Sequence, residues 1–383
     1  MTSVLVAQQT FTQPGGAIRV GLTLIDELLR SNCKVSVALL HKVDLQQLSR
    51  VYFNRELPKS IAVYWLFPGL ISEYQRLFLC LPILRAIKKE NPDVVFIDHD
   101  SYKLLRRYLR DRKVIHYVHF PSHSRRLFEC FPNIVEECRN QRYSRFPFSL
   151  YTFAYGLLQQ FVLVDNDFAD IICANSSFTA EIVKKIWNRD AIVLFPPVSV
   201  NDFVPLRKKN TVVSVGRIEP GKHFEDLIKA IGMCETEPRL QIIGGLTSTN
   251  IPYLNELQQL VAKSKLGYRV RIEINAPYEV VRRVLGSARI YVHPKHWEHF
   301  GISIVEAMAS GCVPIVHRSG GPYYDIIDGD RYGFSFNTIE ELAENIDVLM
   351  TSDISSIAKL CIQRSRCFSE EKFRTKAIEM IGI

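Results

Sequence analysis

The sequence predicts an α/β protein of two similar domains. Short apolar runs that are typical of buried strands alternate along the chain with amphipathic segments that are typical of helices. A length of 383 residues, of which 47% are hydrophobic, is sufficient for two hydrophobic cores. A polar and basic stretch at 199–210 separates the two series and indicates a linker.

Composition restricts the classes of function. The formal net charge of +8 favours an anionic ligand or an anionic membrane surface, and no zinc-finger or RNP-like pattern indicates nucleic acid binding. The nine cysteines are scattered without a CxxC pair, which predicts reduced thiols. No apolar run resembles a signal peptide or reaches the roughly 18–20 residues of a membrane span. We therefore expect a cytoplasmic protein.

The first predicted strand, 3–7, leads into a glycine-containing turn. Gly15 and Gly16 end this turn just before an amphipathic segment, 18–30, that predicts a helix. A strand, a glycine turn and a helix in this order present backbone N–H groups to a phosphate in many α/β proteins. An ordinary strand-to-helix turn has the same pattern, so both interpretations stay open.

An Asp-x-Asp pattern follows the fourth predicted strand. The strands up to this point, and one helix between them, are predicted at 34–40, 61–65, 74–89 (the helix) and 93–98. Asp98-His99-Asp100 resembles the carboxylate pairs that hold Mg²⁺ or Mn²⁺. The same pattern recurs at 165–167 and 328–330, which shows how readily it arises, and we expect no metal site here.

A histidine ends the next predicted strand, 114–119. Side chains at the carboxyl end of a strand point into the cleft of an α/β sheet, so His119 is a candidate ligand-contacting residue. His116 lies three residues earlier on the opposite face and is expected to be structural.

Two segments within 103–163 combine basic and hydrophobic residues. Residues 103–113 predict a basic amphipathic helix, which suits either a solvated surface or anionic lipid headgroups. The second segment has two explanations. It is either a lipid-facing or acceptor-binding surface, or an irregular segment that precedes a core helix at 148–164. That segment alternates arginines with aromatic residues: Arg125, Arg126, Phe128, Phe131, Arg139, Arg142, Tyr143, Arg145, Phe146 and Phe148.

The second half begins with a strand, 211–215, that ends at Gly216 and Arg217, with Lys222 in the loop that follows. A planar guanidinium and a compact ammonium that converge on one place suit a diphosphate. Two further predicted strands end at Gly244 and before the loop Asn275-Ala276-Pro277.

The stretch 288–325 contains the densest group of candidate residues. A strand precedes Glu298, Phe300-Gly301-Ile302 and a helix that contains Glu306. The start of a helix offers unpaired N–H groups and a positive dipole end to phosphate. Glu306 lies about two turns beyond Glu298, so both carboxylates are able to face one cleft and accept from the paired hydroxyls of a ribose or hexose. The glycines of Ser319-Gly320-Gly321-Pro322 are expected to let backbone N–H groups approach a ligand.

Residues 298–314, Glu-His-Phe-Gly-Ile-Ser-Ile-Val-Glu-Ala-Met-Ala-Ser-Gly-Cys-Val-Pro, resemble the signature of retaining glycosyltransferase family 4. Tyr-Val-His-Phe-Pro at 117–121, Asn-Ser-Ser-Phe-Thr at 175–179 and Pro-Pro-Val at 196–198 are similar to one branch of that family. This branch comprises the α-1,2-mannosyltransferases that extend the dolichol-diphosphate-linked oligosaccharide on the cytosolic side of the ER, and archaeal relatives. We expect no N-terminal membrane anchor, in contrast to the eukaryotic enzymes.

The resemblance implies a GT-B fold, in which two Rossmann-like domains face each other across a cleft. An acceptor domain is expected at 1–199, a donor domain at 200–365, and a C-terminal helix at about 366–383 that crosses back to the first domain. The residues implied to contact the donor are Gly15, Gly16, Gly216, Arg217, Lys222, Gly244, Asn275, Ala276, Pro277, Glu298, Phe300, Gly301, Ile302 and Glu306.

The resemblance also implies the reaction, which transfers a hexose from a nucleotide-diphosphate sugar with retention and without a metal. GDP-mannose is the first expected donor and UDP-glucose the second. The acceptor is a glycan or a polyprenyl-linked glycan, with peripheral membrane contact through 103–163. His119 orients the hexose, Glu298 holds its hydroxyls, and Arg217 and Lys222 stabilise the leaving diphosphate. The alternatives are an epimerase or phosphorylase of the same fold, and a non-catalytic glycan- or lipid-binding protein.

Overall fold

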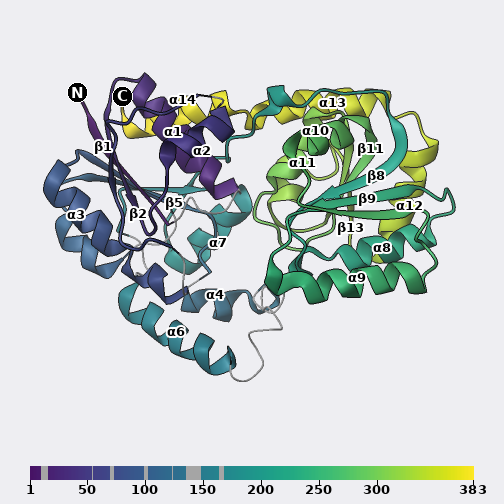
Figure 1. Ribbon diagram of the computed structural model, residues 1–383, viewed down its shortest axis with the longest axis horizontal. Helices are drawn as coiled ribbons and strands as arrows, with labels where there is room; N and C mark the ends of the chain where they lie inside the picture. The colour runs from purple at the N-terminus through teal and green to yellow at the C-terminus, as the bar shows by residue number, and fades with distance from the viewer. Residues whose placement is uncertain are drawn as a thin grey trace. The chain divides into compact units, whose positions relative to one another are not determined.

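The computed structural model of the protein describes residues 1–9, 16–53, 55–69, 73–98, 102–122, 124–134, 148–163 and 168–383. The chain forms two compact units: unit 1 is Met1–Pro197 together with Glu370–Ile383, and unit 2 is Val198–Ser369. Each unit contains one sheet of parallel strands covered by helices (Figure 1). This arrangement confirms the predicted α/β fold class.

The sheet of unit 1 has seven strands in the order β3-β2-β1-β4-β5-β6-β7. The strands are β1 (Ser3–Gln8), β2 (Lys34–Leu39), β3 (Ala62–Tyr64), β4 (Val94–Asp98), β5 (Lys113–Val118), β6 (Ile171–Ala174) and β7 (Ile192–Val193). The strand order reverses between β1 and β4. In sheets of this kind, ligands bind beyond the carboxyl ends of the strands at the point of reversal.

Two of the helices predicted for unit 1 differ from those in the structure. The helix expected at 74–89 is divided into η1 (Glu73–Phe78) and α3 (Cys80–Glu90), because Pro82 lacks an N–H group and is tolerated only in the first turn of a helix. The basic helix expected at 103–113 is a shorter 3₁₀ segment, η2 (Lys103–Tyr108), because Lys113 already pairs with β4. The others are α1 (Gly16–Arg30), α2 (Leu45–Phe53), α4 (Arg125–Cys130), α6 (Phe148–Val162) and α7 (Ser177–Trp187).

The last helix, α14 (Glu370–Ile381), belongs to unit 1 although it follows unit 2 in the sequence. It lies beside α1 (Figure 1), and Phe373 and Ala377 are buried in the core of unit 1. Arg374 pairs with the buried carboxylate of Asp26 at 2.8 Å and with Glu27 at 3.1 Å. The expected return of the C-terminal helix to the first half of the chain is confirmed.

The sheet of unit 2 has six strands in the order β10-β9-β8-β11-β12-β13, and its order reverses between β8 and β11. The strands are β8 (Lys209–Val215), β9 (Arg239–Gly244), β10 (Val270–Ile274), β11 (Ala288–His293), β12 (Val313–His317) and β13 (Phe334–Phe336). The central strands are buried on both faces, which explains why they appear in the sequence as continuous apolar runs.

Six helices of unit 2 form two groups, one on each side of the sheet. Those on one side of the sheet are α8 (Phe224–Met233), α9 (Ile251–Lys263) and α12 (Ile339–Thr351); those on the other are α10 (Tyr278–Ser287), α11 (Ile302–Ala309) and α13 (Ser355–Ser365) (Figure 1). Short turns of helix are η4 (Val200–Asp202), η5 (Pro220–Lys222), η6 (Ser248–Asn250), η7 (Pro322–Ile326) and η8 (Arg366–Phe368). Among the described residues of both units, every helix is too short or too polar to cross a membrane.

Candidate active site

The loops that follow β8 and β11 meet at the reversal point of the unit 2 sheet. The loop after β8 ends in η5, which carries Lys222, and the loop after β11 carries Glu298. The Lys222 Nζ atom lies 2.8 Å from Glu298 Oε2, although the two residues are 76 positions apart in the sequence. The structure thus brings together two of the residues that the sequence predicts to act on one ligand.

The Glu298 carboxylate is buried and accepts four hydrogen bonds. Its Oε2 atom accepts from Lys222 and lies 3.0 Å from His293 Nε2. Its Oε1 atom accepts from Lys295 Nζ at 3.3 Å and from its neighbour's backbone N–H, His299 N, at 3.1 Å. A carboxylate has about four lone-pair sites, so these donors occupy the whole group.

The charges of this cluster determine the protonation states. Burial works to raise the pKa of Glu298, but the ammonium groups of Lys222 and Lys295 and the hydrogen bond from His293 hold it well below its usual range. Burial also lowers the pKa of Lys222, and Glu298 opposes that change. The result is an ionised carboxylate between two cations, at the place where an anion would bind.

A second layer of hydrogen bonds fixes the orientation of His293. The hydroxyl of Tyr291 lies 3.3 Å from His293 Nδ1 and 2.7 Å from Ser303 Oγ. Ser303 donates to the carbonyl of Val215 at 3.2 Å, which ties the first turn of α11 to the end of β8. The side chain of Glu298 is therefore held by a network that reaches both central strands.

The start of α11 lies next to this cluster. Gly301 precedes the helix with φ +91°, and a Cβ atom there would approach Ile304 Cδ1 to 2.6 Å, so only glycine fits without strain. Phe300 is buried against Phe368, with ring centroids 5.6 Å apart. The helix that contains Glu306 begins at Ile302, which the sequence predicts to lie just before it. The start of a helix is a place where unpaired N–H groups and the positive dipole end favour an anion.

The Ser319-Gly320-Gly321 turn supports the Glu298 loop. Gly320 has φ +71°, and a Cβ atom there would lie 2.3 Å from the carbonyl oxygen of Glu298. The N–H of Gly321 donates to that same carbonyl at 2.9 Å, and Trp297 N donates to Ser319 Oγ at 2.8 Å. The glycines were expected to offer N–H groups to a ligand, but the Gly321 N–H is already used to hold the loop.

The second predicted carboxylate, Glu306, is buried on α11. The hydroxyl of Tyr278, at the start of α10, donates to Glu306 Oε1 at 3.0 Å. Burial, together with the charges of Glu306 and Glu298, raises the pKa of the Tyr291 phenol. Both predicted carboxylates therefore lie close to one buried phenol.

The loops after β8, β9 and β10 are joined at their glycines and at Asn275. A Cβ atom on Gly244 would lie 2.0 Å from the carbonyl oxygen of Gly216, so these strand ends require glycine for their close approach. Asn275, with φ +53°, donates its N–H to the Gly244 carbonyl at 2.9 Å, and its side chain accepts from Leu246 N at 3.1 Å. Ala276 follows, and Pro277 then caps α10.

Arg217 is placed differently from Lys222. Its side chain is 68% exposed and pairs with Glu219 at 3.1 Å. The structure keeps Arg217 on the same loop as Lys222, but the contacts that it forms are with this neighbour and not with the Glu298 cluster.

In unit 1, His119 follows β5 and meets the end of β4. Its Nε2 atom lies 2.6 Å from Oδ1 of Asp98, which is fully buried, and its ring packs edge-on against Tyr117 at 5.0 Å. Asp98 is thus the partner of His119, while Asp100 of the same Asp-x-Asp pattern lies outside the described residues. His116 is buried and stacks on Trp187 at 6.0 Å, which agrees with a structural role. Gly16 begins α1, and Gly15 lies outside the described residues.

Both halves of the chain match known protein families. Residues 201–366 match the family Glycosyl transferases group 1, and residues 14–199 match Glycosyltransferase Family 4. The chain belongs to this glycosyltransferase family. The two matches meet close to the boundary between the two units of the structure.

Two mammalian relatives of this glycosyltransferase are both named GDP-Man:Man(3)GlcNAc(2)-PP-Dol alpha-1,2-mannosyltransferase. The human protein is 29% identical over 323 residues, which cover 76% of this chain and 64% of the relative. The mouse protein is 28% identical over 329 residues, which cover 77% of this chain and 65% of the relative. The glycosyltransferase thus spans a little under two thirds of the length of these relatives.

Solved structures of other proteins share the fold of the glycosyltransferase. Sucrose-phosphate synthase from Thermosynechococcus elongatus matches with a TM-score of 0.74 and 16% identity, over 100% of this chain and 98% of that chain. Anabaena HepE in complex with UDP-glucose matches with a TM-score of 0.71 and 16% identity, over 100% and 99%. Both matches support the GT-B arrangement of two parallel sheets.

Sequence reasoning missed several residues of these clusters in the glycosyltransferase. His293 and Asp98 both end strands, so the rule that selected His119 would also have selected them. Lys295 and Tyr278 follow the ends of β11 and β10, but charged and aromatic residues at such places are too common to be informative.

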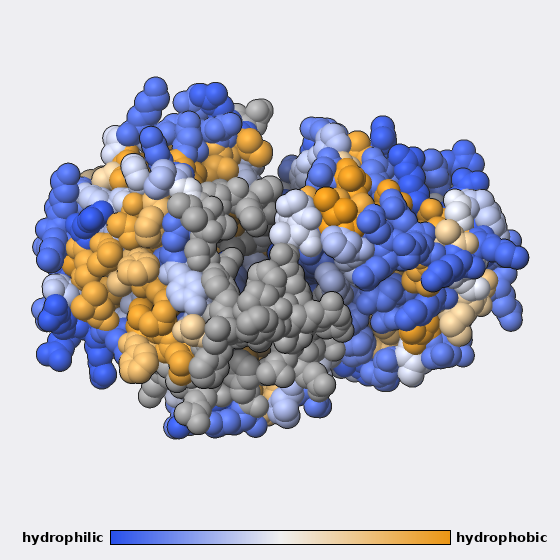
Figure 2. Space-filling view, turned by 60° about the horizontal axis from the view of Figure 1, so that its bottom comes forward, coloured by the Kyte–Doolittle hydropathy of each residue, from blue (hydrophilic) through white to orange (hydrophobic). Residues whose placement is uncertain are grey.

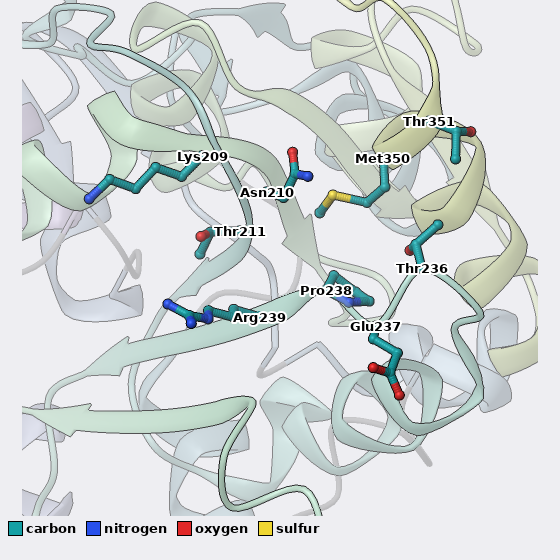
Figure 3. A pocket seen from close by; sticks show the side chains of 9 residues that line it. All are labelled: Lys209, Asn210, Thr211, Thr236, Glu237, Pro238, Arg239, Met350 and Thr351. Carbon is teal, nitrogen blue, oxygen red and sulfur yellow. The ribbon is translucent and has the colours of Figure 1, made fainter.

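A separate pocket in unit 2 lies away from these clusters (Figure 3). It has a volume of about 640 Å³ and is found where β8 and β9 begin, at the opposite edge of the sheet from Lys222 and Glu298. Its lining residues are Lys209, Asn210, Thr211, Thr236, Glu237, Pro238, Arg239, Met350 and Thr351. Because ligands of such sheets bind at the carboxyl ends of the strands, this pocket is not the candidate active site.

Proposed function

We propose that this chain is a retaining hexosyltransferase that moves mannose from GDP-mannose to a polyprenyl-linked glycan. The observation that carries the proposal is the Lys222–Glu298–Lys295 cluster beside the start of α11, at the reversal point of a parallel sheet. The relatives named as mannosyltransferases that use GDP-Man support mannose as the hexose. UDP-glucose is the second candidate donor.

The two ammonium groups and the first N–H groups of α11 bind the diphosphate. Negative charge grows on the diphosphate as its bond to the sugar breaks, and donors already aimed at that position stabilise it without reorganisation. Lys222 and Lys295 are held ready for this role by Glu298. These groups neutralise the leaving group, so the transfer needs no metal; the exposed Arg217 is the additional cation that the family resemblance assigns to it.

Donor binding also changes what Glu298 is able to hold. All four lone-pair sites of its carboxylate are occupied by Lys222, His293, Lys295 and a backbone N–H. When the diphosphate attracts one ammonium group, an oxygen of Glu298 becomes available to a hexose hydroxyl. The carboxylate therefore orients the sugar and is not the nucleophile.

The chemical step follows from this assignment. The bond between the sugar C1 and the phosphate oxygen breaks on the same face on which the acceptor hydroxyl forms the new C1–O bond. The acceptor proton passes to the leaving phosphate, and the anomeric configuration is retained. In unit 1, His119 contacts the hexose. Asp98 holds the imidazole ring of His119 in place, which makes Asp98 a positioning residue.

Glu306 binds the ribose of the donor. Its buried carboxylate accepts a hydrogen bond from Tyr278. Glu306 lies on α11, the same helix whose start binds the diphosphate. The joined loops at Gly216, Gly244 and Asn275-Ala276-Pro277 hold the base. Unit 2 is thus the donor unit and unit 1 the acceptor unit.

Unit 1 also carries an apolar surface that suits a membrane-bound acceptor. Figure 2 shows apolar residues gathered on one face of unit 1, and α6 contacts η1 while α3 contacts η2. Exposed hydrophobic residues of these elements are Phe78, Leu81, Leu104, Leu157, Leu158 and Phe161. The basic residues Lys103, Arg106 and Arg107 of η2 lie on the same elements. An apolar surface with a basic border fits the surface of an anionic bilayer on the cytosolic face.

The donor assignment is tested by titration calorimetry with GDP-mannose and UDP-glucose in the presence of a chelator. We expect GDP-mannose to bind, and Glu306→Gln to weaken it by roughly tenfold to a hundredfold, because hydrogen bonds to a charged acceptor contribute about 1.5–3 kcal/mol each. Glu344→Gln, which removes an exposed carboxylate from α12, is the matched control and should bind as the unchanged protein does. Equal binding by all three proteins contradicts the assignment of Glu306.

The transfer itself is tested with a polyprenyl-linked glycan and GDP-mannose. Mass spectrometry should show the addition of one hexose, and an α-mannosidase should remove it. Release of GDP without a glycan product, or a product that resists α-mannosidase, contradicts the proposed reaction.

The membrane surface is tested by co-sedimentation with vesicles that contain anionic lipids. The variants Phe161→Ser and Arg106→Glu/Arg107→Glu should each reduce the bound fraction. Arg271→Glu, a charge reversal at an exposed arginine of unit 2, should leave it unchanged. Unchanged binding in both test variants contradicts the proposed surface.

A further inference from the structure

Three histidines of unit 2 stack on one another beside the Lys222–Glu298 pair. The rings of His223 and His296 are nearly parallel, with centroids 4.3 Å apart and 9° between their planes. The rings of His296 and His317 are 3.8 Å apart at 31°. These residues come from the start of α8, the loop after β11 and the end of β12, and the proposed transfer uses none of them.

A carboxylate completes the group. Asp226 lies one turn into α8, and its Oδ2 atom is 3.5 Å from His223 Nδ1. Its other oxygen, Oδ1, accepts from Lys229 at 2.9 Å, so Oδ2 is the atom turned towards the imidazole. One ligand atom from each of His223, Asp226 and His296 lies within 4.8 Å of the other two. The side chains of His223 and Asp226 are 17% and 24% exposed, which leaves them accessible from solvent.

Two imidazoles and one carboxylate are the ligand types of zinc-class ions. Such an ion binds nitrogen and oxygen ligands at about 2.0–2.2 Å, which places two ligand atoms of a tetrahedral site about 3.3 Å apart. The 3.5 Å between His223 and Asp226 is close to this spacing, and a ligand atom of His296 lies within 4.8 Å of both. Borderline N/O sites of this kind prefer Zn²⁺, Cu²⁺, Ni²⁺ or Co²⁺ over Mg²⁺ or Ca²⁺.

Hydrogen bonds fix the loop that carries His296. His317 Nδ1 lies 2.7 Å from Ser319 Oγ, which also accepts from Trp297 N and so holds the loop that carries His296.

We propose that His223, Asp226 and His296 bind one zinc-class divalent cation, which joins the loop after β8 to the loop after β11. His223 follows Lys222 directly in the sequence, and His296 lies two residues before Glu298. The ion therefore fastens together the two loops that carry the Lys222–Glu298 pair. It takes no part in the transfer, and its binding does not depend on the proposed donor or acceptor.

The test is a titration of the full chain with Co²⁺, followed by displacement with Zn²⁺, without any nucleotide sugar. We expect one equivalent of Co²⁺ to produce visible d–d absorption without a thiolate charge-transfer band, and Zn²⁺ to abolish it. Asp226→Asn and His223→Gln should each weaken binding by roughly a hundredfold, since even the loss of a residue that only supports a ligand costs 10–100-fold. The ion should also raise the thermal midpoint of the unchanged protein in proportion to RT ln(1 + [L]/Kd).

The controls separate this site from others in the chain. Asp328→Asn removes an exposed carboxylate at φ +52°, a backbone conformation that asparagine also adopts, and should bind Co²⁺ as the unchanged protein does. Circular dichroism without metal shows whether each variant is folded; His296→Gln replaces any variant that is not. A thiolate charge-transfer band would assign the ion to cysteines and overturn the proposal. No binding at micromolar Co²⁺, or equal binding by the ligand variants and the control, would overturn it as well.

Discussion

Removal of Lys222 tests how the unit 2 site is held together. In Lys222→Met the Glu298 carboxylate stays buried, 9% exposed, and keeps Lys295 at 3.3 Å and His293 at 3.0 Å. Loss of one member of a buried ion pair costs about 3–5 kcal/mol, and the two remaining partners place this variant at the lower end of that range. We expect the free energy of unfolding of unit 2 to fall by about 3 kcal/mol.

The second half of the pair supplies the cross-check. Glu298→Gln leaves Lys222 and Lys295 without the carboxylate between them, and we expect a similar loss. The double variant Lys222→Met/Glu298→Gln removes both buried charges, so it should lose less than the sum of the two single changes. The expected coupling energy is on the order of 2 kcal/mol.

Hydrogen exchange of peptides from residues 198–369, measured at increasing urea, gives the free energy of unfolding for unit 2 separately from unit 1. The matched control is Lys263→Met on the exposed face of α9, which should change that free energy by less than about 0.5 kcal/mol. Additivity of the two single changes within about 0.5 kcal/mol would refute the reasoning, because it would show that the two charges do not interact in the folded protein.

Three further substitutions give independent tests. Gly320→Ala should lower the thermal midpoint, because a left-handed residue costs about 1–3 kcal/mol and its Cβ meets a backbone carbonyl at 2.3 Å, whereas Gly221→Ala has nothing within 4 Å and should not. Asp98→Asn should lower turnover about tenfold in steady-state kinetics, with an unchanged KM for GDP-mannose, because His119 loses one charged hydrogen-bond partner. Burial works to raise the pKa of Asp347, but the hydrogen bonds that it accepts lower it below 3.8. Its contribution to stability is therefore present above pH 3.8 and is lost as the pH falls through the folded pKa. The Asp347→Asn variant should lack this loss of stability in an acid titration.

Local sequence signals were sufficient for most strands and most helices, although β13 was not predicted. Apolar runs such as β1 and β4 are buried on both faces, so their composition alone identifies them. The division between η1 and α3 was missed but was readable, because Pro82 is incompatible with the interior of one continuous helix. The shorter η2 was not, because the register between β4 and β5 requires an extended backbone at Lys113.

Site residues were predictable where they follow a strand or start a helix. Glu298, Gly301 and Glu306 were predicted together because they belong to one continuous motif. The exact use of a turn was not predictable, since the N–H of Gly321 serves the Glu298 carbonyl and this contact depends on the path of two separate loops.

By itself, the sequence determined the α/β class, the division into two units, the family and the chemical types available at the strand ends. Only the tertiary structure decided which of these groups meet. Lys222 reaches Glu298 across 76 positions because β8 and β11 are neighbours in the sheet, and Asp98 reaches His119 because β4 and β5 are. Strand order is set by long-range pairing and core packing. The spacing of strands along a chain does not determine which parallel strands lie side by side.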